Sequence, residues 1–515
     1  MNSKLFLLLT ILLTFSAFAA NISKMSAIEL VNDMGLGWNL GNTFDCFGDW
    51  KTITEPDDQI TMWGNVVPTE RLVTTIQKYG FKTVRFPVTW MYFMDGSGNI
   101  RKDWMNRVKE IVDWIYYSDM YVILNVHHDG VSGNWLSNGK SERMRYANLW
   151  RNIATVFKDY DRRLIFESMN EVEYKKNDVY DYDTLKLLTQ SFVDSVRATG
   201  GNNANRLLLI SGANTNLEST CSDKYILPTD PANMLAVSIH YYLPSQFTVE
   251  SDKNPWTWTD EDGVVHVIEP KTTWGTETDY KEMVNNFEAM KKKYTDNGIP
   301  VILGEVGVLT EEEKEEDSRR EFLTAEFSFS ADYDGIMSIL WDTSKNTAGD
   351  MNFYNREDDR WYDEKLQNNF YSISVGKFVK PSDYYSQTNN ETAREVDSDG
   401  NLQINIGTKK IKQVIFNAAI TGTTWNCGFG VGSADENGTW FGDSIGGGDG
   451  VYNKDDKTYT FTIDVAKLSQ TPHSYIQVQR WWGQEQITLN YVTVVFEEYV
   501  MTIDYGAYKK ALSEM

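Results

Sequence analysis

The sequence predicts an α/β protein in which a parallel (β/α)8 barrel, or TIM barrel, is followed by an all-β domain of sandwich or jelly-roll type. Short apolar segments with the composition of buried strands recur eight times between residues 36 and 342, and segments with helical spacing separate several of them. After residue 400 alternating strand patterns replace the helical ones. A doubly wound open sheet also fits the alternation, but eight repeats favour a closed barrel.

Each expected barrel strand is a run of β-branched and other apolar residues that ends in a polar or aromatic group. A helix is expected at residues 69–79, which close on Gly80. The spacing of Trp104, Val108 and Ile111 predicts another helix. The eight expected strands are residues 36–42, 83–88, 121–128, 164–171, 206–213, 235–242, 299–306 and 335–342.

The ends of the chain and a polar stretch near residue 390 divide it into further parts. Residues 1–19 combine a lysine, a short apolar run and the small-residue pattern Ala17-Phe18-Ala19, which is typical of a cleaved signal peptide. We therefore expect a secreted, extracellular protein with no membrane segment after signal removal. The expected parts are the barrel at 20–380, a linker at 381–400, a β-sandwich at 401–500 and a tail at 501–515.

Composition restricts the classes of partner. The 515 residues include 49 basic and 73 acidic side chains, a net charge of −24 that argues against a nucleic-acid partner. Aromatic residues make up 13% of the chain, with 17 Trp, and offer surfaces on which sugars can stack. Cys46, Cys221 and Cys427 show no metal-ligand spacing and form at most one disulfide. We expect a monomer without cofactor or metal.

Polar and aromatic residues gather at the ends of the expected strands. The segment Leu164-Ile-Phe-Glu-Ser-Met-Asn-Glu-Val172 runs through apolar residues into an amide and an acid, and Ile299-Pro-Val-Ile-Leu-Gly-Glu305 repeats the design. The carboxyl ends of barrel strands converge on one rim, where active sites lie. We therefore expect a shared site to which the strand ends contribute Asn42, Arg85, His127, Asn170, Glu171, His240, Tyr242, Glu305 and Trp341.

Two glutamates on such a rim suit retaining glycoside hydrolysis, in which one acid protonates the leaving oxygen and the other attacks the sugar. Glu171 follows an amide, whereas Glu305 belongs to a set with Arg85 and Tyr242 that can keep a nucleophile ionised. Glu305 is therefore the expected nucleophile and Glu171 the expected acid. Adjacent residues of a strand point to opposite sides, so we expect His127, and not its neighbour, to face the site directly.

Three other functions use some of the same residues. A metal hydrolase would take His127, His128 and Asp129 as ligands, although adjacent side chains on one strand diverge. A non-catalytic sugar-binding protein would not need both acids. An endo-β-mannanase or endo-xylanase would share the reacting subsite and differ in its loops, of which the segment 244–276 is long and carries Trp256, Trp258 and Trp274.

Eight short segments carry a resemblance to a known family. In chain order they are GWNLGNTFD at 37–45, WGN at 63–65, TVRFPV at 83–88, LNVHHD at 124–129, IFESMNE at 165–171, IHYY at 239–242, ILGE at 302–305 and ILWD at 339–342. Together they resemble glycoside hydrolase family 5, and its subfamily 4 in particular, over about residues 25–380. The resemblance implies an endo-β-1,4-glucanase acting on cellulose, mixed-linkage β-glucan and xyloglucan.

The resemblance also implies roles for individual residues. Glu171 matches the acid/base and Glu305 the nucleophile, which Arg85 and Tyr242 orient, and Asn170 matches the amide that binds the sugar 2-hydroxyl. The matching substrate-binding residues are Asn42, Trp63, Arg85, His127, His128, Trp135, Asn170, His240, Tyr242 and Trp341, the last as the platform beneath the reacting sugar.

Further tryptophans are candidates for sugar contacts outside the strand ends. Trp63, Trp90 and Trp135 follow the first three strands, where an indole could stack on additional glucosyl units. In the β-domain, adjacent residues 481 and 482 face opposite sides of one strand, so one of them should be exposed. We therefore expect an accessory carbohydrate-binding module, with Trp440, Trp481 and Trp482 as candidate contacts.

Overall fold

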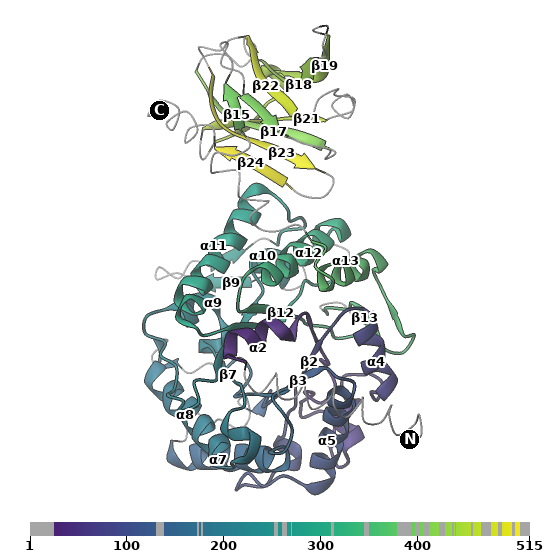
Figure 1. The fold of residues 1–515 in the computed structure, drawn as a ribbon, viewed down its shortest axis with the longest axis vertical. Helices are drawn as coiled ribbons and strands as arrows, with labels where there is room; N and C mark the ends of the chain where they lie inside the picture. The colour runs from purple at the N-terminus through teal and green to yellow at the C-terminus, as the bar shows by residue number, and fades with distance from the viewer. Residues whose placement is uncertain are drawn as a thin grey trace, which may run out of the picture. The chain divides into compact units, whose positions relative to one another are not determined.

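Figure 1 shows the computed structural model of the chain, which divides into two compact units, Met1–Phe378 and Val379–Met515. None of the helices it describes is long and apolar enough to cross a membrane. The expected signal peptide lies outside the described residues. These are 25–129, 139–172, 175–176, 179–251, 256–259, 265–268, 270–310, 314–344, 350–378, 393–396, 402–405, 411–421, 428–434, 437, 439–454, 457–464, 475–482, 487–496 and 500–504.

Eight parallel strands of the first unit close into a barrel in the order β1-β12-β11-β8-β7-β4-β3-β2. Each overlaps one of the eight predicted segments, so the barrel prediction is confirmed. The strands read as continuous apolar runs because both faces are buried. Their bounds are β1 Gly37–Asn39, β2 Thr83–Phe86, β3 Tyr121–Asn125, β4 Leu164–Glu167, β7 Leu208–Ser211, β8 Leu235–Tyr241, β11 Val301–Val306 and β12 Ile336–Leu340.

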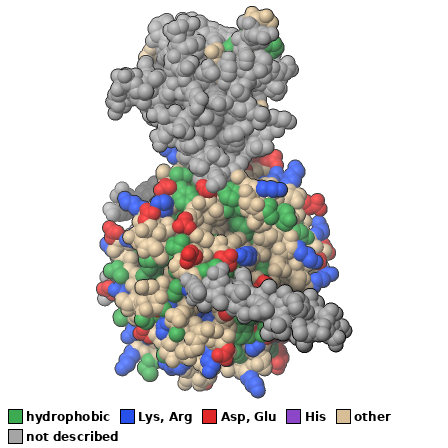
Figure 2. Space-filling view, viewed as in Figure 1, with side chains coloured by type: hydrophobic (Ala, Val, Ile, Leu, Met, Phe, Trp, Pro, Cys, Tyr) green, Lys and Arg blue, Asp and Glu red, His purple; other side chains and the backbone are tan. Residues whose placement is uncertain are grey.

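Amphipathic helices surround the barrel, and acidic and basic side chains are interspersed with neutral ones on the face of this unit seen in Figure 2. In α5, the predicted Trp104, Val108 and Ile111 are all fully buried. The helices are α2 Ala27–Met34, α3 Pro56–Ile60, α4 Glu70–Lys78, α5 Lys102–Tyr117, α7 Lys140–Val156, α8 Tyr182–Arg197, α9 Leu217–Cys221, α10 Ser245–Thr248, α11 Glu277–Lys293, α12 Glu316–Asp332 and α13 Glu364–Ser374.

Helix α2 closes the amino-terminal end of the barrel. Its start is defined by a capping box in which Ser26 and Glu29 satisfy each other's backbone N–H groups. Leu30 and Met34 pack with Ile302 and Ile339 of the barrel in one buried cluster. Apolar side chains therefore fill the interior of the barrel at this end.

The second unit contains two five-stranded antiparallel sheets, ordered β15-β16-β22-β18-β19 and β20-β21-β17-β23-β24. Phe416, Phe429 and Phe461 are fully buried and contact one another through their rings, as expected for a β-sandwich core. The strands are β15 Ala393–Val396, β16 Leu402–Asn405, β17 Ile411–Ile420, β18 Gly428–Ala434, β19 Trp440–Gly446, β20 Val451–Asn453, β21 Thr458–Asp464, β22 Tyr475–Trp482, β23 Ile487–Phe496 and β24 Val500–Asp504.

Several strands lie where the sequence did not indicate them. β15 falls inside the segment expected to be a linker, and β24 includes residues expected to form the tail. Three two-stranded hairpins decorate the barrel unit, and strands of two to four residues are too short to show a reliable period. The hairpins pair β5 Lys175–Lys176 with β6 Val179–Tyr180, β9 Trp256–Thr259 with β10 Val265–Ile268, and β13 Tyr354–Asn355 with β14 Arg360–Trp361.

Candidate active site

The carboxyl ends of the barrel strands surround a cavity of about 400 Å³. Strand β4 leads into Glu171, β8 leads into Tyr242, and β11 carries Glu305. The cavity brings together side chains from six strand ends or the loops that follow them. Its lining consists of the predicted Asn42, Trp63, His127, His128, Asn170, Glu171, Tyr242, Glu305 and Trp341, and of Val249, Leu309, Thr343, Asp350 and Met351, which the sequence did not indicate.

The two predicted acids meet at His240. Its Nδ1 atom lies 2.9 Å from Glu171 Oε1 and 3.4 Å from Glu305 Oε2. One oxygen of each glutamate and a ring nitrogen of His240 all lie within 4.8 Å of one another. Carboxyl groups about 5 Å apart are typical of retaining glycosidases, whereas inverting enzymes keep theirs about 6.5–9.5 Å apart to admit a water. The spacing therefore favours a double displacement.

Arg85 holds a buried network beneath the acids. Its guanidinium donates from Nη1 to Glu305 Oε1 at 2.8 Å and to Asn39 Oδ1 at 3.0 Å. It donates from Nε to Glu167 Oε2 at 2.7 Å and from Nη2 to Asn170 Oδ1 at 2.8 Å. The guanidinium is planar and its donors are fixed relative to one another. One side chain therefore sets the positions of the Glu305 carboxylate and the Asn170 amide together.

Glu167 is a second buried counter-ion of Arg85, and sequence reasoning missed it. Its side chain is fully buried and accepts hydrogen bonds from Ser238 Oγ at 2.8 Å and from Asn125 Nδ2 at 3.1 Å. A buried carboxylate without such partners would carry a large desolvation penalty. The available signal was an acid inside the expected strand 164–171, since a buried carboxylate needs hydrogen-bond donors or a cation as partners.

Glu305 is held on both oxygens. Besides the bond from Arg85, its Oε2 accepts from the Tyr242 hydroxyl at 2.9 Å. Burial nevertheless raises the pKa of Glu305 above its ordinary value of 4.5, and the opposing charges of His240 and Arg85 do not cancel this shift. The predicted contacts are present, but the carboxyl is harder to ionise than its positive neighbours alone would make it.

Glu171 differs from Glu305 mainly in exposure, since its side chain is 46% exposed and that of Glu305 only 6%. Desolvation acts to raise the pKa of Glu171, but the hydrogen bond and charge of His240 outweigh it and hold that pKa below its ordinary value. In the free protein the pKa of Glu171 is thus lowered and that of Glu305 raised. A proton donor needs a raised pKa and a nucleophile a lowered one, so both shifts are opposite to what the expected roles require.

Asn125 fixes the tautomer of His127. The Asn125 Oδ1 atom accepts from the Val88 backbone N–H at 3.0 Å, so its Nδ2 amine faces His127 Nδ1 at 3.1 Å and donates to it. Burial lowers the pKa of His127 well below its ordinary value. The ring is therefore neutral, with its proton on Nε2, and can donate that proton in a hydrogen bond to a sugar hydroxyl.

His128 lines the cavity beside His127, so the expectation that only one of the pair faces the site was wrong. Strand β3 ends at Asn125, and the alternation of a strand does not extend to the two histidines. Burial lowers the pKa of His128 to about 4, so this ring is neutral as well. The site thus presents two uncharged imidazoles next to each other, with ring centroids 4.4 Å apart.

Trp341 follows β12 and forms one wall of the cavity. Its ring is parallel to that of His127, with an interplanar angle of 4° and centroids 5.9 Å apart. A Cβ on Gly41 would lie only 3.1 Å from the indole, so the ring packs closely on the backbone after β1. Arg356 joins these two segments, because it donates to the Gly41 carbonyl at 2.7 Å and to the Asp342 carbonyl at 2.5 Å.

The remaining candidate tryptophans separate into different classes. Trp63 is partly exposed and packs edge-on against Phe47 and His128 at the cavity. Trp90 is fully buried and donates from its indole N–H to the Asn125 carbonyl at 3.0 Å, so its candidacy as a sugar platform was wrong. Trp135 lies outside the described residues. Trp274 is 4% exposed, and the side chains of Trp256 and Trp258 are not among those described.

Asp129, the acid of the alternative metal site, is used in a structural hydrogen bond. Both carboxylate oxygens of Asp129 accept from the Trp90 backbone N–H, at 2.9 and 3.1 Å. His127 and His128 instead form a group with Asp45 in which the potential ligand atoms lie within 4.8 Å of one another. The carboxylate of Asp45 already caps the backbone N–H groups of Asn42 and Thr43, and so anchors the loop after β1.

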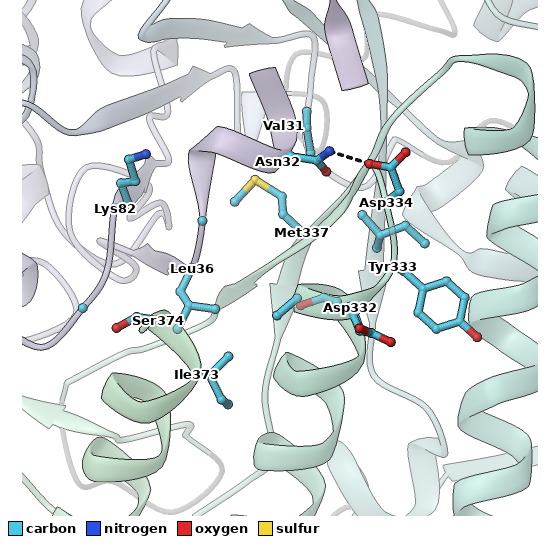
Figure 3. A pocket seen from close by; sticks show the side chains of 15 residues that line it. Val31, Asn32, Leu36, Lys82, Asp332, Tyr333, Asp334, Met337, Ile373 and Ser374 are labelled. Carbon is cyan, nitrogen blue, oxygen red and sulfur yellow. Dashed lines mark hydrogen bonds between the residues drawn. The ribbon is translucent and has the colours of Figure 1, made fainter. Parts of the chain in front are cut away.

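A second cavity of about 320 Å³ lies at the opposite, amino-terminal ends of the strands. Figure 3 shows Lys82, just before β2, and Met337 of β12 on its walls, with Asn32 donating to Asp334. Residues at this end of a barrel serve stability in characterised enzymes. The paired glutamates lie at the other end, so this cavity has no part in the candidate site.

In the second unit, the candidate Trp440 begins the edge strand β19 and is partly exposed. Trp481 and Trp482 close strand β22, but their side chains are not among those that the structure describes. The prediction that one of these two is exposed therefore stays untested. Trp440 is the candidate contact of this unit whose side chain is placed.

Comparison with known proteins gives consistent matches over the barrel. The sequence profile described as cellulase (glycosyl hydrolase family 5) matches residues 43–347. Endoglucanase A of Paenibacillus barcinonensis is 33% identical over 365 residues, which are 66% of this chain and 88% of that protein. A GH5-4 broad specificity endoglucanase from an uncultured bovine rumen ciliate is 71% identical with a TM-score of 0.66, covering 68% of this chain and 99% of that one. The GH5 lichenase of Caldicellulosiruptor sp. F32, solved as a mutant with cellotetraose, is 28% identical with a TM-score of 0.61, covering 68% and 96%.

Proposed function

The chain belongs to glycoside hydrolase family 5, and on this premise we infer that it is an endo-β-1,4-glucanase that cleaves internal bonds of a β-glucan with retention of anomeric configuration. The observation that carries this inference is the pair Glu171 and Glu305, because one oxygen of each lies within 4.8 Å of the other and of a ring nitrogen of His240. At that separation one acid attacks the sugar directly while the other protonates the leaving oxygen.

Glu305 is the proposed nucleophile. Its two oxygens are oriented by Arg85 and Tyr242, and a carboxylate held in this way loses little freedom when it attacks the anomeric carbon. Asn170, fixed by the same guanidinium, is positioned to bind the 2-hydroxyl of the sugar undergoing attack. The neutral Nε2–H of His127 and the face of Trp341 complete the subsite for this sugar.

Glu171 is the proposed acid/base, although its pKa in the free protein is lowered. A bound glucan would cover a side chain that is 46% exposed and so raise its pKa by desolvation. Glu305 is only 6% exposed, so the same sugar changes its surroundings much less. We therefore propose that substrate binding itself brings the two pKa values into the order that the reaction needs.

The proposed division of labour is tested with two alanine variants and an activated aryl cellobioside. Glu305→Ala should hydrolyse neither polysaccharide nor aryl cellobioside, because every substrate requires the nucleophile. Glu171→Ala should lose polysaccharide hydrolysis but still release dinitrophenolate, which departs without protonation, and then stall as the glycosyl-enzyme. Azide should restore turnover of Glu171→Ala and give a β-glycosyl azide. Rescue of Glu305→Ala to a β-linked product would reverse the assigned roles.

We propose that the second unit is a carbohydrate-binding module, because it is a separate β-sandwich with a partly exposed tryptophan on an edge strand. Tethering such a module to an enzyme raises the local enzyme concentration on an insoluble polymer. Affinity electrophoresis in β-glucan gels should retard the inactive full chain, Glu305→Ala, more than the same variant ended at residue 378. Substitution of Trp440 by alanine should reduce the difference, whereas equal mobility of both chains would contradict the module.

We also propose that the protein is exported and acts as a monomer. The pattern at residues 17–19 supports signal cleavage. Amino-terminal sequencing of the protein from culture medium should begin at Ala20, and light scattering should give the mass of one chain. A protein retained in the cell with Met1 intact would contradict export.

A further inference from the structure

Trp50 stands apart from the other tryptophans of the barrel unit. Its side chain is 67% exposed, whereas every other tryptophan whose side chain the structure describes is buried or only partly exposed. Exposing an indole costs free energy that burial would recover. A single exposed aromatic residue needs no explanation by itself, so its significance depends on how it is held and on what it adjoins.

The indole of Trp50 is seated against a fixed piece of backbone. A Cβ on Gly48 would lie 2.1 Å from the ring, so the indole covers this glycine closely and residue 48 cannot carry a side chain without displacing it. The Tyr92 hydroxyl accepts from the Gly48 N–H at 2.7 Å and donates to the Gly48 carbonyl at 2.6 Å. The base of the ring is therefore tied to the segment after β2.

A row of rings connects this segment to the candidate active site. Phe47, directly before Gly48, packs on His128 with centroids 4.4 Å apart and on Trp63 at 5.8 Å. His128 contacts His127, which is parallel to the Trp341 platform. The loop that presents Trp50 thus begins at the wall of the site and leads outward from it.

The loop that carries Trp50 leaves strand β1, which the barrel order places next to β12 and three strands away from β4. In the order β1-β12-β11-β8-β7-β4-β3-β2, strand β4 with Glu171 is diametrically opposite β12 with Trp341. The leaving part of the substrate lies toward Glu171, because that residue donates its proton. The Trp341 side therefore holds the non-reducing part, or glycone, and β1 is the neighbour of β12.

We propose that Trp50 is the stacking platform of an outer glycone subsite, beyond the sugar on Trp341 and the rings of Phe47 and Trp63, and that its ligand is a glucosyl unit of a β-1,4-linked chain. The inference rests on the proposed endoglucanase function. An exposed indole on a fixed base offers a flat face at low entropic cost, as sugar and aromatic ligands require. The residue sets how strongly the enzyme prefers long over short substrates.

The test is the dependence of kcat/KM on substrate length. Wild-type protein, Trp50→Ala and Trp50→Phe are compared on cello-oligosaccharides of increasing length and on an aryl cellobioside, which is too short to reach an outer subsite. Trp50→Ala should lose roughly 3- to 10-fold on the long substrates and nothing on the aryl cellobioside, and Trp50→Phe should recover part of the loss. Tyr117→Ala is the matched control, because Tyr117 is 74% exposed at the end of α5 that leads into β3, away from the site.

Each outcome decides the proposal. An unchanged ratio of long to short substrates in Trp50→Ala overturns it, as does an equal loss on the aryl cellobioside, which would indicate a general effect on the fold. Loss of binding to insoluble cellulose with unchanged oligosaccharide kinetics would make Trp50 a surface anchor and also overturn the subsite. If the wild-type protein cleaves none of the β-1,4-glucans, the proposed function fails first.

Discussion

The hydrogen bond from Tyr242 to the proposed nucleophile gives a prediction whose size follows from the structure. Tyr242→Phe removes one hydroxyl, which lies 2.9 Å from Glu305 Oε2, and leaves the Arg85 bond to Oε1 in place. A hydrogen bond to a charged group contributes about 1.5–3 kcal/mol. Only the part of that free energy gained in the transition state lowers kcat/KM at its pH-independent plateau, by at most about 10- to 150-fold, and the rest appears as a shift in the pKa of Glu305.

The same substitution should also move the acid limb of the pH profile. Glu305 acts in its ionised form, so activity is lost as pH falls through its pKa, which burial already raises above 4.5. Removing a donor that stabilises the ionised form raises this pKa further. The limb should therefore move to higher pH, by about one to two units if the whole bond energy favours ionisation.

The assay is the pH dependence of kcat/KM with an aryl cellobioside, measured for wild type, Tyr242→Phe and Tyr241→Phe. Tyr241 is the adjacent residue, but it is buried on the other side of β8, where its hydroxyl accepts from Asn286 Nδ2 at 3.1 Å. Tyr241→Phe should lower stability and leave the limb where it was. A Tyr242→Phe profile with both plateau and limb unchanged, or with the limb at lower pH, would refute the reasoning.

Three further predictions concern groups away from the two acids. Burial raises the pKa of Glu326 to about 8, above about 4.3 in an unfolded chain. The folded state therefore holds the proton more tightly, and the free energy of unfolding falls as pH rises between these two values. Glu326→Gln should remove up to about 1.4 kcal/mol of this loss per pH unit, as measured by urea unfolding at several pH values. Arg356→Lys keeps the charge but cannot hold the Gly41 and Asp342 carbonyls together. It should cost about 1.5–3 kcal/mol of stability in thermal melts, and in kinetic assays it should lower kcat with little change in the pH profile. Trp90→Ala should cost about 3–5 kcal/mol of stability without altering length preference, since Trp90 is fully buried; a change in oligosaccharide selectivity would show that it touches substrate after all.

The fold was predictable because its strands are buried on both faces and therefore appear as apolar runs of similar length. The short hairpins were not, because a strand such as β13, with two residues, has no measurable period. β15 was missed for a different reason. Its sequence Ala-Arg-Glu-Val has the polar composition of its surroundings, and it is a strand only through its pairing with β16.

Site residues were predictable where the residue type alone indicates the reaction, as it does for acids at the ends of apolar strands. Glu171 and Glu305 end apolar runs with an acid, and the barrel rule brings such ends together. Glu167 was not found, because its importance depends on Arg85 from another strand. His128 and Trp90 were misplaced because the direction of a side chain beyond a strand end depends on local backbone and on partners such as Asn125, neither of which the sequence specifies.

The position of His240 between the acids affects how charge is distributed during the proposed reaction. In the first half-reaction Glu305 loses its negative charge as it becomes an ester, and Glu171 gains one as it gives up its proton. The second half-reaction reverses both changes, so the total charge of the pair stays constant while its location alternates. His240 Nδ1 lies 2.9 Å from one carboxylate and 3.4 Å from the other. A single N–H donor can therefore stabilise whichever oxygen is charged after only a small rotation, and the fully buried Arg85 need not move at all.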